Sequence, residues 1–252
     1  MEKPLTFGTA IIVSVDFADF LSVTLPWNKH HFERVLVITH PEDEATLKVA
    51  EESGVEILQT EMFHWKRAHF NKWAAVEFGL DYIGKTGWIT LLDADIMIPQ
   101  VVQIRGLEIG KAYCPRKRAV PREKRQWIRD ETKWSRYRFE DLREPPRAHM
   151  LTFHADDPVL QRHPWFTNIW RWCGTGDDTF VERWKSHNVV RPLFDVLHLG
   201  QRRVNWCGRT ETYLDGTYVP DDIRDLRQQN VGVLLRQSAI LRGVDDRYKG
   251  GV

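Results

Sequence analysis

Residues 87–99 read GWITLLDADIMIP, an apolar run whose far end carries two carboxylates. Ile89–Leu92 has the composition of a buried strand, and Asp93 and Asp95 follow at its carboxyl end. Side chains two residues apart in a strand lie on the same face, so both aspartates are expected to point at one place. Two adjacent carboxylates repel each other, and a divalent cation such as Mg²⁺ or Mn²⁺ would relieve that repulsion. The alternative is a turn in which one aspartate caps a following helix.

The residues before this stretch alternate between apolar runs and helical patterns. We expect strands at 9–15, 34–38 and 55–59, and helices at 16–32, 41–54 and 71–82. Pro26 is expected to interrupt the first helix. This order predicts an α/β fold with a parallel sheet, whose ligands bind beyond the carboxyl ends of the strands. The polar residues at those ends are Asp16, Thr39, Asp93 and Asp95.

Residues 116–147 are strongly basic, with 12 Lys or Arg against 6 Asp or Glu. Strands are expected on either side of them, at 111–115 and 148–154, and one or two helices at 221–243. A loop of this length is typical of a functional or a disordered segment. The simpler alternative is a solvated helix of mixed charge.

Composition limits the class of protein. The 252 residues are 42% hydrophobic and 28% charged, with a net charge of +1, as in an ordinary globular protein. The 11 tryptophans are suited to a recognition surface as well as to a core. No apolar run approaches the roughly 18 residues of a membrane span, and the N-terminus lacks the features of a secretory leader. The three cysteines form no C-x-x-C pair. These features predict a soluble, cytoplasmic protein without a disulfide or zinc framework.

Four short motifs resemble those of GT-A fold glycosyltransferases and occur in the same order, over about residues 9–209. LLDADI (91–96) resembles the Asp-x-Asp motif of that family, and FNKWAAVEFG (70–79) looks like the helix whose Asn-Lys start faces the nucleotide sugar. WCGTGDDTF (172–180) is similar to the Gly-rich segment with an acidic pair, although related sequences often have Gly-Gly-Glu-Asp or Gly-Glu-Asp-Asp there. VLHLGQRRVNWCGR (196–209) resembles the late stretch whose histidine completes the metal site.

The resemblance implies a GT-A fold, with a mixed, mainly parallel sheet flanked by helices. It also implies a metal-dependent, inverting enzyme that moves a hexose from a nucleotide diphosphate sugar, taken to be a UDP-sugar, to an acceptor hydroxyl. Residues 1–252 would form one catalytic domain. Its nucleotide-sugar half would cover about 1–100, its acceptor half 101–215 with the basic insert 116–147, and a helical tail 216–252.

The resemblance assigns Mn²⁺ or Mg²⁺ to Asp93, Asp95 and His198, which suit a hard or borderline cation. Asp93 has a second reading as a ribose contact, and His198 has one as a buried histidine bonded to a carbonyl. The acceptor hydroxyl must lose a proton as it attacks, and Asp177 or Asp178 would take it. Because Asp177 is better placed to cap the following helix, Asp178 is favoured as the base.

Further donor contacts are expected from Asp16, Lys72, Arg202, Arg203 and Arg209. Asp16 would contact the nucleobase or ribose, Lys72 a phosphate or sugar hydroxyl, and the arginines the diphosphate, which guanidinium groups bind bidentately. Each has a structural alternative. Asp16 can cap a helix, Lys72 can be an exposed first-turn lysine, and the arginines can lie on a solvated loop.

The basic insert suggests what the acceptor is. Basic groups neutralise phosphates and aromatic rings stack on exposed bases, so DNA bearing a hydroxymethylated, flipped-out base is one expected acceptor. Glycan, protein and small-molecule acceptors stay open. The candidate acceptor contacts are Arg116, Lys117, Arg118, Trp127, Trp134 and Trp206, the last of which also suits core packing.

Two other classes of protein share some of these features. A nucleotidyltransferase also uses paired aspartates and a metal, but it usually has a Gly-rich phosphate loop after the first strand. VSVDFAD (13–19) contains no such loop. A non-catalytic carbohydrate- or nucleic-acid-binding protein would keep its binding after loss of Asp95 and Asp178.

Overall fold

The computed structural model describes residues 6–102, 106–139, 149–161, 164–166, 176–192, 194–200, 208–209, 212–215 and 217–224. Within them, seven strands form a sheet in the order β10-β6-β9-β4-β1-β2-β3. These strands are β1 (Thr9–Val13), β2 (Arg34–Thr39), β3 (Glu56–Gln59), β4 (Trp88–Asp93), β6 (Ala112–Tyr113), β9 (Met150–His154) and β10 (Val189–Val190). β1 pairs in parallel with β2 and β4, while β9 runs antiparallel to β4. The predicted mixed, mainly parallel α/β sheet is therefore confirmed.

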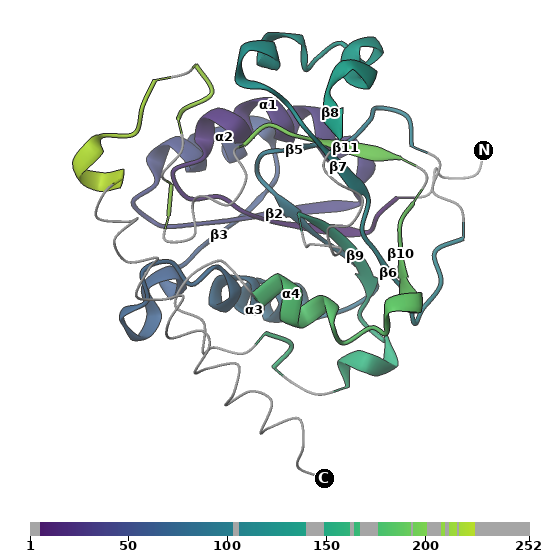
Figure 1. Cartoon of the computed structure of the whole chain (residues 1–252). Coiled ribbons are helices and arrows are strands. Elements are labelled where there is room, and N and C mark those ends of the chain that lie inside the picture. Colours follow the sequence, from purple (N-terminus) through teal and green to yellow (C-terminus); the bar gives the residue numbers. More distant parts are fainter. Residues whose placement is uncertain are drawn as a thin grey trace.

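Helices cover both faces of this sheet (Figure 1). α1 (Ala18–Asn28) and α2 (Glu44–Ser53) lie on one face, and α3 (Lys72–Ile83) and α4 (Gly176–Val181) on the other. Short 3-10 helices connect the elements: η1 (Lys29–His31), η2 (Met62–Arg67), η5 (Pro158–Leu160) and η6 (Ser186–Asn188). The expectation that Pro26 interrupts the first helix is wrong, since Pro26 lies inside α1. Burial of the neighbouring Leu21 and Leu25 in the core holds the helix together there.

Alternation along the central strands sends side chains into two cores. Ile11 and Leu91 pack with the residues of α3, while Ala10 and Leu92 pack with those of α1 and α2. This parity has a consequence at the end of β4. Asp93, two residues after Leu91, falls on the face that α3 covers.

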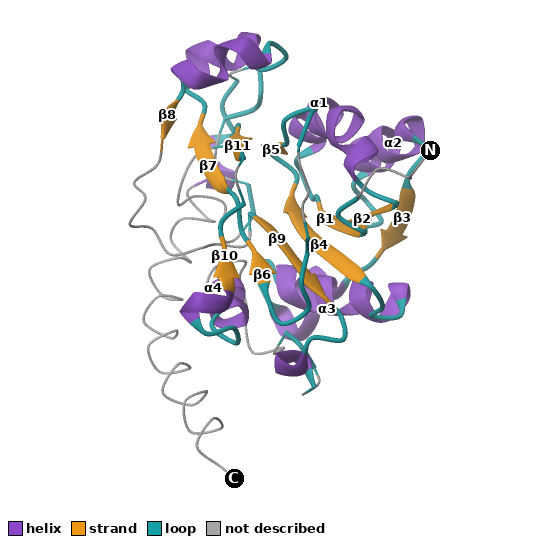
Figure 2. Ribbon diagram, turned by 90° about the vertical axis from the view of Figure 1, so that its right-hand side faces the viewer, coloured by secondary structure: helices purple, strands orange, loops and turns teal. Residues whose placement is uncertain are grey.

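A second sheet packs beside α1 and has the order β5-β11-β7-β8 (Figure 2). It consists of β5 (Ile96–Met97), β11 (Asp195–His198), β7 (Arg116–Ala119) and β8 (Arg138–Phe139). A third apolar cluster joins it to α1, with Phe20 of α1 against Met97 and Leu197. α1 therefore lies between the two sheets.

The described part of the basic insert, 116–139, is not a loop. It forms β7, the 3-10 helices η3 (Arg122–Trp127) and η4 (Glu131–Arg136), and β8, and the two short helices lie over the second sheet (Figure 2). Ile128, Trp134 and Tyr137 are buried in the third cluster. Apolar residues spaced among the charges therefore fix this segment, and neither a disordered loop nor a solvated helix describes it.

Little of the expected C-terminal helix falls within the described residues. Residues 221–224 are helical, and the rest of the range 221–243 lies outside the part of the chain that the structure describes. The division of the chain into halves of one domain stays a prediction. In the described residues, no helix has the length and apolar character that crossing a membrane requires.

Polar side chains of α1 hold the segment that follows β4. Asn28 donates from Nδ2 to the Ile96 carbonyl at 2.7 Å and accepts from the Ile98 N–H at 2.9 Å. Thr24 donates to the Ala94 carbonyl at 2.6 Å. Asn28 and Thr24 are buried, so these bonds form out of contact with solvent. They fix the backbone on both sides of Asp95.

This arrangement predicts the effect of removing the Asn28 amide. Asn28→Ala leaves the buried Ile96 carbonyl and Ile98 N–H without partners, which is expected to lower the free energy of unfolding by about 2–4 kcal/mol in urea titrations. Ser22→Ala is the control on the same helix. Within the described residues its exposed hydroxyl bonds only the Asp19 carbonyl, so the change is expected to stay within about 0.5 kcal/mol. Equal losses in the two variants would show that Asn28 does not hold β5.

Candidate active site

The carboxyl end of β4 divides the two aspartates between two layers of the fold. β4 ends at Asp93, residues 94–95 form a turn, and β5 starts at Ile96. The two side chains, which were expected to point at one place, have different partners, although the charge of Asp93 also acts on His198. Asp93 keeps the strand's parity and meets α3, while the turn directs Asp95 toward the second sheet.

Asp93 is paired with the first residue of α3. Lys72 Nζ lies 2.5 Å from Asp93 Oδ1, and both side chains are partly buried. Asn71 caps the helix by accepting from the Ala74 N–H at 3.0 Å, which fixes the helix start. The predicted Lys72 is thus at the site, with an aspartate as its partner.

Strand register brings Asp95 to His198. β5 pairs antiparallel with β11, with Ile96 opposite His198, and the Leu199 N–H donates to the Asp95 carbonyl at 2.9 Å. His198 Nε2 lies 3.2 Å from Asp95 Oδ2. Asp95 is 8% exposed and His198 7% exposed. Two residues 103 positions apart in the chain thus form a buried pair.

The electrostatics of this pair favour charges of opposite sign. Burial raises the pKa of the Asp95 carboxyl, but the His198 charge and hydrogen bond, together with the Lys117 ammonium, bring that pKa down to about 2. Burial lowers the pKa of His198, and the Asp95 carboxylate overcomes this effect and raises it. At the carboxyl end of β4, the carboxylate and the imidazole therefore each favour the charged form of the other.

These residues fit a divalent cation. Two adjacent ligands of an octahedral ion, each about 2.1 Å from it, lie about 3 Å apart, which matches the separation of Asp95 Oδ2 and His198 Nε2. The other ring nitrogen of His198, Nδ1, is buried and has no hydrogen-bond partner within the described residues. No group of three His, Cys, Asp or Glu that could hold a metal occurs in the described part of the chain. Further ligands would then be water or the oxygens of a bound diphosphate.

The structure adds two residues to this site. The charge of Lys117 acts on Asp95, His198 and His149, and its position on β7, opposite Val196, puts it on the same sheet face as His198. Lys117 was predicted as an acceptor contact. His149 escaped prediction. Its Nε2 bonds the Pro115 carbonyl at 3.0 Å, and burial, followed by the charges of Lys117 and His198, holds its pKa well below the usual value.

The backbone of Asp177 and Asp178 lies in the first turn of α4, next to α3. A Cβ added to Gly176 would meet the Trp73 indole at 2.2 Å, so α4 packs directly against the residue that follows Lys72. The side chains of the two aspartates lie outside the described set, so their roles stay predictions. Arg202, Arg203 and Trp206 also lie outside the described residues.

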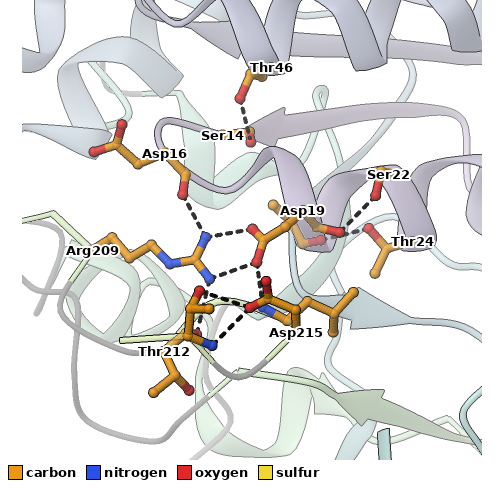
Figure 3. Close-up of polar contacts among 12 residues, drawn as sticks. Ser14, Asp16, Asp19, Ser22, Thr24, Thr46, Arg209, Thr212 and Asp215 are labelled. Carbon is orange, nitrogen blue, oxygen red and sulfur yellow. Dashed lines mark hydrogen bonds and ion pairs between the residues drawn. The ribbon is translucent and has the colours of Figure 1, made fainter. Parts of the chain in front are cut away.

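Arg209 joins the start of α1 to the described residues 208–209 and 212–215 near the end of the chain (Figure 3). Its guanidinium binds both carboxylate oxygens of Asp19, at 2.5 and 2.9 Å, and donates to the Asp16 carbonyl at 2.7 Å. Arg209 is 1% exposed, and the rings of Phe17 and Tyr213 lie 4.7 and 4.3 Å from its guanidinium carbon. A diphosphate contact by Arg209 would require these bonds to break, so the fold favours a structural tie.

Asp16 adopts a left-handed backbone, with φ of 63°. Its N–H donates to Asp43 Oδ2 at 2.8 Å, and its side chain is exposed. α1 begins at Ala18 without a side-chain cap, so the alternative that Asp16 caps this helix is wrong. Its contact with a nucleotide stays a prediction. A pocket of about 470 Å³ nearby is lined by Asp19, Ser22, Tyr213, Leu214, Asp215 and Thr217.

Several predicted acceptor contacts have structural partners. Arg116 and Arg118 both bind Asp195, at 2.9 and 2.7 Å. Trp134 is buried, and its Nε1 donates to the Ile128 carbonyl at 2.9 Å. Trp127 is only partly buried, and the ammonium nitrogens of Lys124 and Lys133 lie 5.8 and 5.6 Å from the centre of its ring. Of the two candidate tryptophans on η3 and η4, Trp127 is thus the one whose ring is accessible to a ligand.

Comparison with known proteins gives no family assignment. No family model matches the chain, and no significant match exists among curated proteins. A glucosyl-3-phosphoglycerate synthase from M. tuberculosis is 11% identical over 78% of this chain and 73% of that one, with a TM-score of 0.45. The same enzyme in complex with Mn²⁺, UDP and glucosyl-3-phosphoglycerate gives 10% identity, 78% and 72% coverage, and a TM-score of 0.45. Mannosyl-3-phosphoglycerate synthase from Rubrobacter xylanophilus gives 18% identity, 60% and 54% coverage, and a TM-score of 0.38. Alignments at this level establish neither a shared family nor a shared activity.

The burial of Arg209 predicts a large cost for its loss. Arg209→Met leaves the Asp19 carboxylate without its bidentate partner and is expected to lower the free energy of unfolding by about 3 kcal/mol in urea titrations. Arg34→Met is the control, because Arg34 also binds a carboxylate bidentately, through Nε and Nη2 to Glu56, at side-chain exposures of 35% and 43%. There the expected loss is about 0–1 kcal/mol. Similar losses for both variants would rule out a tie at Arg209.

Proposed function

We propose that the chain is a metal-dependent, inverting glycosyltransferase that moves a hexose from a nucleotide diphosphate sugar to an acceptor hydroxyl. One observation carries the proposal. At the carboxyl end of a parallel strand, Asp95 and His198 meet at 3.2 Å in a buried pair, and Asp93 lies two residues away. Ligands of such sheets bind at this edge, and a carboxylate with an imidazole suits Mn²⁺ or Mg²⁺.

Asp95 and His198, with Asp93 beside them, would hold the ion, which supplies Lewis-acid stabilisation of the negative charge on the leaving diphosphate. The donor is taken to be a UDP-sugar. Lys72, Arg202 and Arg203 would bind its phosphates, and Asp16 its base or ribose. Lys117, on β7, adds a positive charge that acts on Asp95 and His198.

The transfer forms a bond between the acceptor oxygen and the anomeric carbon, while the bond from that carbon to the diphosphate oxygen breaks. The acceptor proton passes to Asp178, or to Asp177 if the helix cap falls on its neighbour. The packing of Gly176 on Trp73 supports this role, because it brings the first turn of α4 next to the start of α3, where Lys72 meets Asp93. A base on the far side of the sugar from the diphosphate gives inversion.

The activity has a direct test. Purified protein is offered a panel of nucleotide sugars with Mn²⁺, Mg²⁺ or EDTA, and donor hydrolysis is measured by release of the nucleotide diphosphate. Turnover is expected with the metal and is expected to stop in EDTA. Turnover in EDTA, or none with any donor, would contradict the proposal and favour a nucleotidyltransferase or a non-catalytic binding protein.

Variants assign the roles within the site. Asp95→Asn is expected to lower both Mn²⁺ affinity and kcat, the latter by about 100-fold or more, since it removes a ligand. Asp178→Asn is expected to lower transfer by about 100- to 10,000-fold and to leave Mn²⁺ affinity unchanged. Asp81→Asn, at an exposed position near the end of α3, is the control. If Asp95→Asn and Asp178→Asn both transfer at the wild-type rate, this mechanism is wrong.

DNA stays a second candidate for the acceptor because Lys124 and Lys133 flank the partly buried Trp127 ring. If a DNA strand lies there, Lys124→Gln/Lys133→Gln is expected to elute from immobilised DNA at lower salt than the wild type, since two phosphate contacts are lost. Lys48→Gln/Lys111→Gln changes the net charge equally at positions away from η3 and η4. Identical elution of both double variants would exclude this surface and leave glycan, protein or small-molecule acceptors.

A further inference from the structure

Each aspartate of the site is paired with a basic side chain of the protein itself. Lys72 on α3 neutralises Asp93 at 2.5 Å, and His198 on β11 faces Asp95 at 3.2 Å. The two basic groups come from different layers of the fold, one from the helix α3 and one from the second sheet. Each carboxylate thus already has a basic partner in the folded chain, before any ligand arrives.

The position of Lys72 is unfavourable for the helix that carries it. Lys72 is the first residue of α3, and α3 has no acidic residue in its first turn. The positive end of the helix dipole disfavours a cation there. The Asn71 cap and the buried face of α3 fix the helix start, and Lys72 Nζ lies 5.0 Å from the Trp73 ring. The ammonium therefore depends on nearby negative charge, which Asp93 supplies.

A divalent cation on the aspartates would lie close to this ammonium. The two would repel, and Lys72 would have to leave Asp93 or share it with the ion. An anionic diphosphate bound to the same ion offers the ammonium a replacement partner, because its oxygens accept charge-assisted hydrogen bonds. The cost of displacing Lys72 is then recovered only when both ligands are present.

We propose that Lys72 is a resident counter-ion of Asp93 that competes with the divalent cation, so that cation and nucleotide diphosphate bind cooperatively. This inference rests on the proposed function. It assigns Lys72 a second role, besides donor contact, as the residue that links the two binding steps. Linkage is reciprocal, so each ligand raises the affinity for the other by the same factor.

Binding of Mn²⁺ alone tests the inference without turnover. Mn²⁺ affinity is measured by calorimetry and by the loss of the free-ion electron paramagnetic resonance signal, with and without UDP. In the wild type, UDP is expected to tighten Mn²⁺ binding by about tenfold or more, and Mn²⁺ to tighten UDP binding equally. Wild-type affinities that are independent of the second ligand would overturn the inference.

The variant Lys72→Met removes the competitor. It is expected to bind Mn²⁺ alone about tenfold more tightly than the wild type, and the further tightening by UDP is expected to be about tenfold smaller than in the wild type, because only the direct contact between the ion and the diphosphate remains. Lys72→Arg keeps the charge and is expected to keep the coupling. Lys111→Met is the control for the loss of one lysine outside the site. Thermal unfolding confirms that each variant is folded.

The outcomes separate the two hypotheses. Unchanged or weaker Mn²⁺ binding by Lys72→Met, when the wild type hydrolyses donor with Mn²⁺, overturns the role of Lys72 and leaves the glycosyltransferase intact. No Mn²⁺ binding by the wild type, with or without UDP, and no donor turnover overturns both.

Discussion

The end of β4 carries two partly or fully buried carboxylates, and the need to give each of them a basic partner is the constraint to which the rest of the site responds. Asp93 takes its partner from α3 and Asp95 takes its partner from β11, so the helix layer, the main sheet and the second sheet meet at one point. Removing either basic partner would leave a partly or fully buried charge uncompensated. The same packing of α3, the main sheet and the second sheet therefore also brings each carboxylate to its partner.

α1 makes the pairing of the two aspartates possible, because it fixes the turn that contains Asp95. Its buried Thr24 and Asn28 bind the backbone on both sides of Asp95, and its other end is joined to residues 208–209 and 212–215 by Arg209. The helix therefore holds the two sheets in a fixed relation. Its buried Thr24 and Asn28 bind the backbone next to Asp95. Such contacts place Asp95 with a precision that the strand alone, which ends at Asp93, does not provide.

The sequence predicted elements whose cause is local and missed contacts whose cause is distant. The apolar runs gave the central strands, and Asn71 and Gly54 marked helix ends that the structure confirms. The helix break predicted at Pro26 is wrong, because burial of Leu21 and Leu25 outweighs the backbone hydrogen bond that a proline cannot donate. The turn at Asp95 could not be read from alternation, since Asn28, about 70 residues away, imposes it. His149 has no motif of its own, and only the pairing of β9 with β4 brings it to the site.

The three basic residues of β7 lie on two faces of the strand and have different partners. β7 reads Arg-Lys-Arg, and alternation puts Arg116 and Arg118 on one face, where Asp195 neutralises both. Lys117 falls on the other face, where its charge reaches Asp95 and His198. Part of the excess positive charge of residues 116–147 is therefore used inside the fold, and one lysine of it is delivered to the candidate active site. A count of basic residues overstates what this segment offers to a polyanionic acceptor, because the count does not distinguish charges that the fold has already paired.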